Sequence, residues 1–145
     1  MRIRKSTQDD LQLVAKLALE LWPDNSMNAI SAEFMQLLQS SDAAVFLAFL
    51  DGKAVGFAEC KLRADYVEGT DTSPVGYLEG IYVCEAYRMR GIAKQLLSAC
   101  ESWVKECGCK EFASDCELTN EESLRFHLKV GFTEANRVIC FTKQL

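Results

Sequence analysis

Residues 87–94 read Tyr87-Arg88-Met89-Arg90-Gly91-Ile92-Ala93-Lys94, a short run with three basic side chains and one glycine. It follows a predicted strand, residues 76–84, and contains the start of the most strongly amphipathic helical pattern in the sequence, residues 88–107. The first backbone N–H groups of a helix have no partner within it, and the helix dipole places positive charge there. Gly91 lets a ligand approach the backbone closely. Three basic side chains add charge: Arg88, Arg90 and Lys94. The pattern predicts an anion site that fits a pyrophosphate.

The alternative is a basic first turn whose glycine packs against the sheet. Helices disfavour cations in their first turn, so three basic side chains there favour a bound anion.

The segments around this turn predict a single α/β domain over residues 1–145. Strand 76–84, helix 88–107 and strand 112–116 form a strand–helix–strand unit, which implies one parallel pair with a right-handed crossover. The other predicted elements are strands 1–5, 43–50, 53–63 and 132–143, and helices 11–22, 29–39 and 121–130. This order predicts a mixed, strongly twisted, mostly antiparallel sheet with one central parallel pair and helices on both faces.

Composition excludes several classes of protein. The chain has 16 basic and 21 acidic side chains and a formal charge of -5, the opposite of a nucleic-acid binder. No apolar run approaches the roughly 20 residues of a membrane span. Polar residues follow the basic N-terminus where a signal peptide has an apolar core. We therefore expect a cytoplasmic protein that binds neither nucleic acid nor membrane.

The seven cysteines form no disulfide framework, because their number is odd and their spacing irregular. Cys107 and Cys109 have no second ligand pair nearby, so no metal site is expected. The cysteines are expected to be free, mostly buried thiols in a reducing compartment.

Two motifs carry a family resemblance. Arg88-x-x-Gly91-x-Ala93 resembles the R/Q-x-x-G-x-G/A signature of the GNAT N-acetyltransferases. Asn120, Ser123 and then Phe-His-Leu-Lys-Val-Gly-Phe at 126–132 are similar to that family's "N…A…FYEKLGF" segment. The resemblance covers essentially the whole chain, and it implies the GNAT fold and acetyl-CoA as cosubstrate.

Five further stretches resemble the type I aminoglycoside 6′-N-acetyltransferases of Gram-negative bacteria. They are Leu21-Trp22-Pro23, residues 64–69, Ser73-Pro74-Val75, residues 77–83 and Ala113-Ser114-Asp115. This resemblance implies acetyl transfer to the 6′-amino group of aminoglycosides by direct attack in a ternary complex, and hence antibiotic resistance. It also implies a homodimer, formed through residues 132–143.

The resemblance assigns the coenzyme side. The pantetheine arm is expected to pair with the backbone of Ile81, Tyr82 and Val83, where an N–H group stabilises the oxyanion. The remaining coenzyme residues are expected to be Arg88, Met89, Arg90, Gly91, Ile92, Ala93, Lys94, Asn120 and Ser123.

Two catalytic residues are expected. Glu79 lies in a strand between apolar neighbours, where a carboxylate is costly to bury without a task. The resemblance makes it the general base, acting through water; the alternative is a sheet-edge charge paired with a basic group. His127 stands where many relatives carry a tyrosine proposed as the general acid. A lone histidine is more often a packed residue than a catalyst. Three roles of His127 therefore stay open: general acid, coenzyme contact and packing in the core.

The acceptor side is predicted from charge. Residues 65–79 contain four acidic and no basic side chains, and Asp115 and Glu117 are expected on one face of the following strand. Aromatic rings can stack on sugars or belong to the core, and acidic loops are often plain solvated surface. The candidate acceptor residues are Trp22, Tyr66, Glu68, Asp71, Tyr77, Glu79 and Asp115. The expected occupant is a polycationic aminosugar, well separated from the basic coenzyme site.

Two other functions fit the same patterns. One is a GNAT enzyme that acetylates a polyamine or a peptide amine. The other is a non-catalytic acetyl-CoA-binding module, which has no reason to keep Glu79 and the acceptor-side acids.

Overall fold

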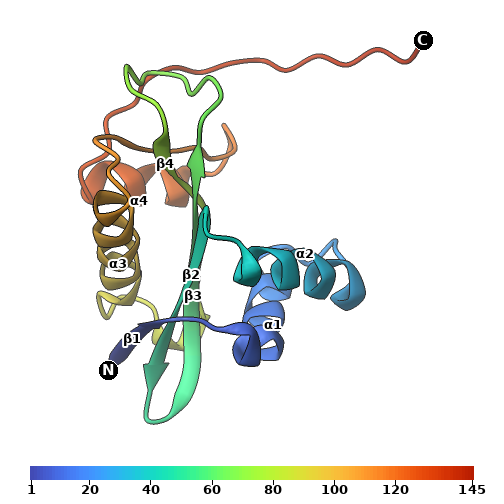
Figure 1. The fold of residues 1–145 in the computed structure, drawn as a ribbon, viewed down its shortest axis with the longest axis vertical. Coiled ribbons are helices and arrows are strands. Elements are labelled where there is room, and N and C mark those ends of the chain that lie inside the picture. Colours follow the sequence, from blue (N-terminus) through green and yellow to red (C-terminus); the bar gives the residue numbers. More distant parts are fainter.

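The computed structural model describes residues 1–145 as a five-stranded sheet with helices on both faces (Figure 1). The strands are β1 (Arg2–Lys5), β2 (Ala43–Leu50), β3 (Lys53–Arg63), β4 (Val75–Val83) and β5 (Phe112–Ser114). The helices are α1 (Leu11–Leu21), α2 (Met27–Gln39), α3 (Ile92–Glu106) and α4 (Glu121–Lys129). Helices α1 and α2 cover one face of the sheet, and α3 and α4 the other (Figure 1). No helix is long and apolar enough to span a membrane.

The strands lie in chain order, β1-β2-β3-β4-β5. The first four pair antiparallel, and β4 pairs parallel with β5 across the α3 connection. This confirms the mixed sheet with one parallel pair. The pair is at the edge of the sheet, not at its centre, because no strand lies on the far side of β5.

The predicted strand at 132–143 is wrong, because the chain after α4 forms no strand. Figure 1 shows this segment leaving the body and running outward to the C-terminus. A strand needs a neighbour that satisfies its N–H and C=O groups, and this segment has none in its own chain. The apolar pattern that predicted the strand is left exposed at Val138, Ile139 and Phe141.

Two element boundaries near the site also differ from the prediction. The helix expected from residue 88 begins at Ile92. Met89 and Gly91 adopt the left-handed backbone conformation, with φ of 62° and 77°, which interrupts a right-handed helix. Strand β5 ends at Ser114, so Asp115 and Glu117 lie beyond it and share no strand face.

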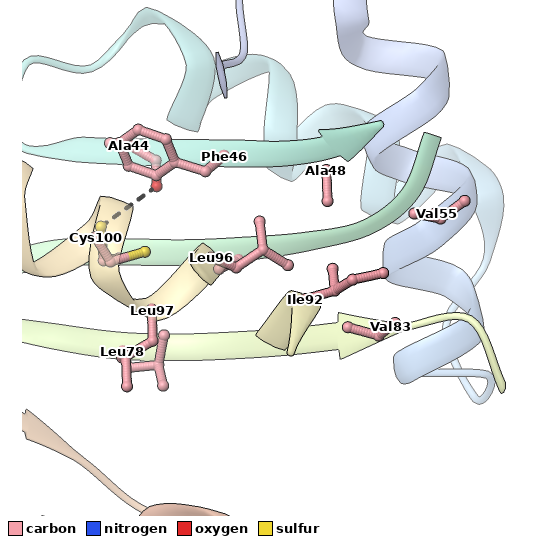
Figure 2. Close-up of a cluster of buried hydrophobic side chains, with 12 residues drawn as sticks. Ala44, Phe46, Ala48, Val55, Leu78, Val83, Ile92, Leu96, Leu97 and Cys100 are labelled. Atoms are coloured by element: carbon pink, nitrogen blue, oxygen red, sulfur yellow. Dashed lines mark hydrogen bonds between the residues drawn. The ribbon is translucent and has the colours of Figure 1, made fainter. Parts of the chain in front are cut away.

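The two hydrophobic cores fix β3 and β4 in place. On one face, Ile92, Leu96 and Leu97 of α3 point onto β2, β3 and β4 (Figure 2). On the other face, α1 and α2 pack against β2 and β3, with Phe34 of α2 edge-on to Phe57 at 6.1 Å between ring centroids. Each fully buried side chain of this size contributes about 1.5–3 kcal/mol. The strands that carry the site are therefore a rigid support.

A β-bulge shapes the middle of β4. Glu59 pairs with Gly80, whereas the next residue of β3, Cys60, pairs with Leu78. Glu79 is therefore the extra residue of the bulge and has no partner on β3. Strand β5 pairs with β4 only from Gly76 to Leu78. Beyond Leu78, one backbone edge of β4 has no neighbouring strand.

All seven cysteines are free thiols, but most of them are not buried. Cys60, Cys100 and Cys109 are buried and Cys84 is half-buried. Cys107, Cys116 and Cys140 are exposed because they follow α3, β5 and α4, outside the two cores. The expectation of mostly buried thiols is therefore wrong.

Candidate active site

The start of α3 has the geometry of an anion site. Gly91 is the N-cap, with φ 77° and ψ 9°, and the first helical hydrogen bond runs from the Gln95 N–H group to its carbonyl at 3.2 Å. The N–H groups of Ile92, Ala93 and Lys94 therefore have no partner within the helix. A Cβ atom on Gly91 would meet nothing within 4 Å, so its backbone conformation, not crowding, favours glycine here.

The basic side chains of this turn have different tasks. Arg88 Nε donates a hydrogen bond to the Val83 carbonyl at 2.9 Å, which ties the turn to the end of β4. The Arg90 guanidinium lies 5.6 Å from the ring centroid of Tyr87, and both Arg90 and Lys94 are exposed. Arg90 and Lys94 therefore remain available to an incoming phosphate.

The open edge of β4 leads to this turn. Ile81, Tyr82 and Val83 pair with β3 on one side only. On the other side no strand pairs with them, and their outward-facing backbone groups can pair with an extended chain bearing amides, except for the Val83 carbonyl, which accepts from Arg88. An extended ligand can thus run along β4 and place its anionic end at the start of α3.

Asn120, Ser123 and His127 lie together on α4. The Asn120 side chain caps the helix, accepting a hydrogen bond from the Ser123 N–H group at 3.0 Å. His127 Nδ1 is 2.7 Å from the Ser123 carbonyl oxygen, which only accepts, so Nδ1 carries the proton. Nε2 is within hydrogen-bond distance of the Ser114 hydroxyl, at 2.8 Å. His127 therefore joins α4 to β5, and its role as the acid stays a prediction.

Glu79 lies at one end of a linked set of four side chains. Both of its carboxylate oxygens accept hydrogen bonds from Arg63, each at 2.8 Å. The Arg63 guanidinium stacks over the Tyr77 ring, 3.5 Å from its centroid. The Tyr77 hydroxyl donates a hydrogen bond to Asp115. Burial and the neighbouring carboxylate raise the pKa of Tyr77, which keeps that hydroxyl protonated.

Arg63 is the residue of this set that sequence reasoning missed. The prediction that the acceptor side lacks counter-charges is wrong, because β3 brings Arg63 and Lys61 to it. Alternation along β3 places Glu59, Lys61 and Arg63 on one face of the sheet, a signal that the sequence does contain. The ion pair considered as an alternative for Glu79 is therefore present.

A cavity of about 260 Å³ opens beside Glu79. It is lined by Trp22, Asn25, Ile30, Glu33, Glu59, Lys61 and Glu79. Trp22 and Glu79 were predicted, whereas the other charged residues of the lining were not. Trp22 also packs edge-on against Phe57, 6.1 Å between ring centroids, so it serves both the core and the cavity. Three carboxylates against one lysine give the lining an affinity for cations.

The other predicted acceptor residues lie apart from this cavity. Tyr66, Glu68 and Asp71 are exposed on the loop between β3 and β4, and none of them lines it. The Tyr66 hydroxyl donates to Glu68 at 2.5 Å. Glu111 holds the loop by accepting from the N–H groups of Asp71 and Thr72 at 2.9 and 2.8 Å. Of the predicted acceptor residues, Trp22 and Glu79 line the cavity, Tyr77 and Asp115 are linked to Glu79 through Arg63, and the loop residues lie outside.

Comparison with known proteins places this geometry in a family. Residues 8–132 match the acetyltransferase (GNAT) family. The chain is 42% identical over 144 residues to an aminoglycoside N(6′)-acetyltransferase type 1 of Salmonella enteritidis, with 99% of each chain covered. It is 39% identical to the protein of that name from Acinetobacter haemolyticus, covering 100% of this chain and 99% of the relative.

A solved structure shares both the fold and the sequence. It is AAC(6′)-Iy in complex with the bisubstrate analog CoA-S-monomethyl-acetylneamine. The TM-score is 0.95 at 41% identity, with 99% of this chain and 98% of that chain covered. The chain belongs to the acetyltransferase (GNAT) family.

Proposed function

We propose that this protein transfers the acetyl group of acetyl-CoA to the 6′-amino group of aminoglycoside antibiotics, by direct attack in a ternary complex, and so confers resistance. The relatives of that name, 42% and 39% identical over the whole chain, support the proposal. The observation that carries it is the open edge of β4, which runs between a positively charged helix start and a carboxylate-lined cavity.

The coenzyme is bound by backbone more than by side chains. Its pyrophosphate lies at the start of α3, on the N–H groups of residues 91–94, with Arg90 and Lys94 neutralising its charge. Its pantetheine arm pairs with the free edge of Ile81, Tyr82 and Val83, and Asn120 donates a hydrogen bond to it from α4. A backbone N–H group on β4 stabilises the oxyanion, and needs no reorganisation because two cores fix the strand.

The acceptor enters from the face covered by α1 and α2. Its ammonium groups are attracted to the carboxylates of the cavity and to Asp115, while Trp22 offers a ring face to a sugar. Glu79 meets the reacting amine, either as its base or as its anchor. The exposed loop with Tyr66, Glu68 and Asp71 flanks the entrance and contacts the outer sugar rings.

Expression in a susceptible bacterium tests the resistance activity. The wild-type chain is expected to raise the inhibitory concentration of an aminoglycoside that carries a 6′-amino group, and not of one with a 6′-hydroxyl group. Glu79→Gln, compared at equal soluble protein, should abolish the increase. Equal protection by Glu79→Gln would remove Glu79 from the site, and no protection by the wild type would contradict the proposal.

The proposal includes a homodimer in the cytoplasm. The exposed apolar residues of the C-terminal segment, Val138, Ile139 and Phe141, are covered by a second copy. The free thiols suit a reducing compartment. Light scattering after gel filtration should give a dimer for the full chain and a monomer for a chain ending at Arg137. A monomeric full chain, or a truncated chain that still dimerises, would contradict this arrangement.

A further inference from the structure

Glu59 is a buried carboxylate that no structural role explains. Its side chain, on β3, is only 3% exposed. It makes no hydrogen bond within the chain, and its nearest cation, Lys61 Nζ, is 3.7 Å from Oε1. Burying a carboxylate with so little compensation costs free energy. The side chain lines the cavity that Glu79 and Trp22 also line.

The ion pair with Lys61 does not account for this position. Lys61 is two residues further along the same strand, so the pair links no separate elements. The lysine side chain is 36% exposed, and water competes with the carboxylate for it. A leucine at position 59 would extend the apolar face that begins with Phe57. What distinguishes the carboxylate is its access to the cavity.

The proposed reaction requires a proton acceptor in this cavity. The acceptor amine enters as an ammonium ion and attacks only after losing a proton. Both oxygens of Glu79 accept hydrogen bonds from the Arg63 guanidinium, so a proton taken by Glu79 would neutralise its side of that ion pair. Glu59 accepts no hydrogen bond, and its one ion pair is the 3.7 Å contact with Lys61. Glu59 is therefore the free carboxylate of the two.

The charges around Glu59 suit proton transfer near neutral pH. Burial raises the pKa of Glu59 to about 7; Lys61 on β3 opposes this shift, and the negative charges of Glu79 on β4 and Glu33 on α2 add to it. A base with a pKa near the working pH is partly ionised and still binds a proton well.

Resting on the proposed function, we infer that Glu59 takes the proton from the acceptor's ammonium group, directly or through one water, while Glu79 anchors that group. The ammonium ion and the Glu59 carboxylate become a neutral amine and a carboxylic acid. The amine lone pair forms the N–C bond, the C–S bond breaks, and the leaving thiolate takes the second proton from nitrogen. Glu59 then releases its proton to solvent through the cavity, which returns the enzyme to its starting state.

Glu59→Gln tests this role, because glutamine keeps the size of the side chain and removes the proton acceptor. With an aminoglycoside acceptor, kcat should fall about 100-fold or more. The acetyl-CoA Kd, measured by calorimetry, should not change, and neither should the activity of the control Glu106→Gln, at the exposed end of α3. Wild-type kcat/KM should fall as pH drops below about 7. The pH profile of Glu59→Gln should lack this decline on the acidic side.

Two results would overturn the inference. One is a Glu59→Gln variant with wild-type kcat and pH profile; the other is a variant that raises only the acceptor KM, since Glu59 would then be a binding charge. Glu59→Ala with added formate provides a second test, because a small carboxylate should restore kcat if proton transfer is what was lost. If formate restores nothing, the inference fails.

The inference and the proposed function can fail separately. A wild-type protein that acetylates spermidine and no aminoglycoside overturns the proposed acceptor, and Glu59→Gln is then tested with spermidine. Normal aminoglycoside turnover by Glu59→Gln overturns only the role of Glu59. A wild type that acetylates no amine overturns both.

Discussion

Replacing Glu59 with glutamine should make the fold more stable at alkaline pH, although it removes a charged side chain from a cavity. Burial raises the pKa of Glu59 from 4.5 in the unfolded chain to about 7 in the folded one. Between these values the folded state binds more protons than the unfolded state, so the free energy of unfolding falls as pH rises. At about 1.4 kcal/mol per pH unit, the buried charge costs the wild type about 3 kcal/mol above neutrality.

Urea unfolding followed by tryptophan fluorescence measures this effect. At about pH 8.5 the variant should be more stable than the wild type by up to about 3 kcal/mol. The difference should shrink as pH falls and vanish near pH 4.5, where Glu59 is protonated in the folded state. Glu106→Gln is the matched control and should follow the wild type. Equal stabilities at all pH values, or a variant less stable at alkaline pH, would show that the buried Glu59 charge does not destabilise the fold.

Three further substitutions test the fold and the two halves of the site. Asp10→Asn should cost about 2 kcal/mol at neutral pH, because Arg4 and the Thr7 backbone hold the pKa of Asp10 at about 2 instead of 3.8. Urea titrations should show that difference disappearing as pH falls from about 4 to 2, and a constant difference would contradict it. Gly80→Ala places a Cβ atom 2.6 Å from Trp22 Cη2, so the indole must move. The acceptor KM should therefore rise while the acetyl-CoA Kd stays constant. An unchanged acceptor KM would remove Trp22 from the site. Gly91→Ala should cost about 1 kcal/mol through its positive φ and weaken acetyl-CoA binding in calorimetry, whereas wild-type affinity would contradict the placement of the pyrophosphate.

The coenzyme side could be predicted from the sequence because it is local. A strand, a glycine-containing turn and a helix follow one another within residues 75–106, and the anion site needs only the backbone where they join. The helix start was misplaced by four residues, at 88 in place of Ile92. Positive φ at Met89 caused this error, since a methionine in that conformation has no reliable sequence signal.

The acceptor side could be predicted only in part because it depends on strand pairing. Glu79 stood out by itself, as a carboxylate among apolar residues. Its partner Arg63 lies 16 positions earlier and reaches it only through the register of β3 and β4. The bulge at Glu79 shifts that register by one residue, which no periodicity reveals. Glu59 lies in the predicted strand 53–63, and its spacing does not set it apart from Lys61 or Arg63 on the same face.

The C-terminal segment shows a different limit. Its apolar residues have the pattern of a strand, yet no strand of its own chain lies beside it. Hydrophobic patterning indicates that a segment can pair, and does not say whether the partner belongs to the same molecule. The proposed dimer supplies that partner, and the truncation at Arg137 tests it.

Release of the coenzyme A thiol by purified protein, with acetyl-CoA and matched acceptors, measures the proposed acetyl transfer itself. The panel holds tobramycin, an aminoglycoside with a hydroxyl group at the 6′ carbon, spermidine and a basic peptide. We predict thiol release with tobramycin and none with the 6′-hydroxyl compound. No thiol release with either aminoglycoside, together with release with spermidine or the peptide, would contradict the proposed acceptor. It would leave the fold and the coenzyme site unaffected.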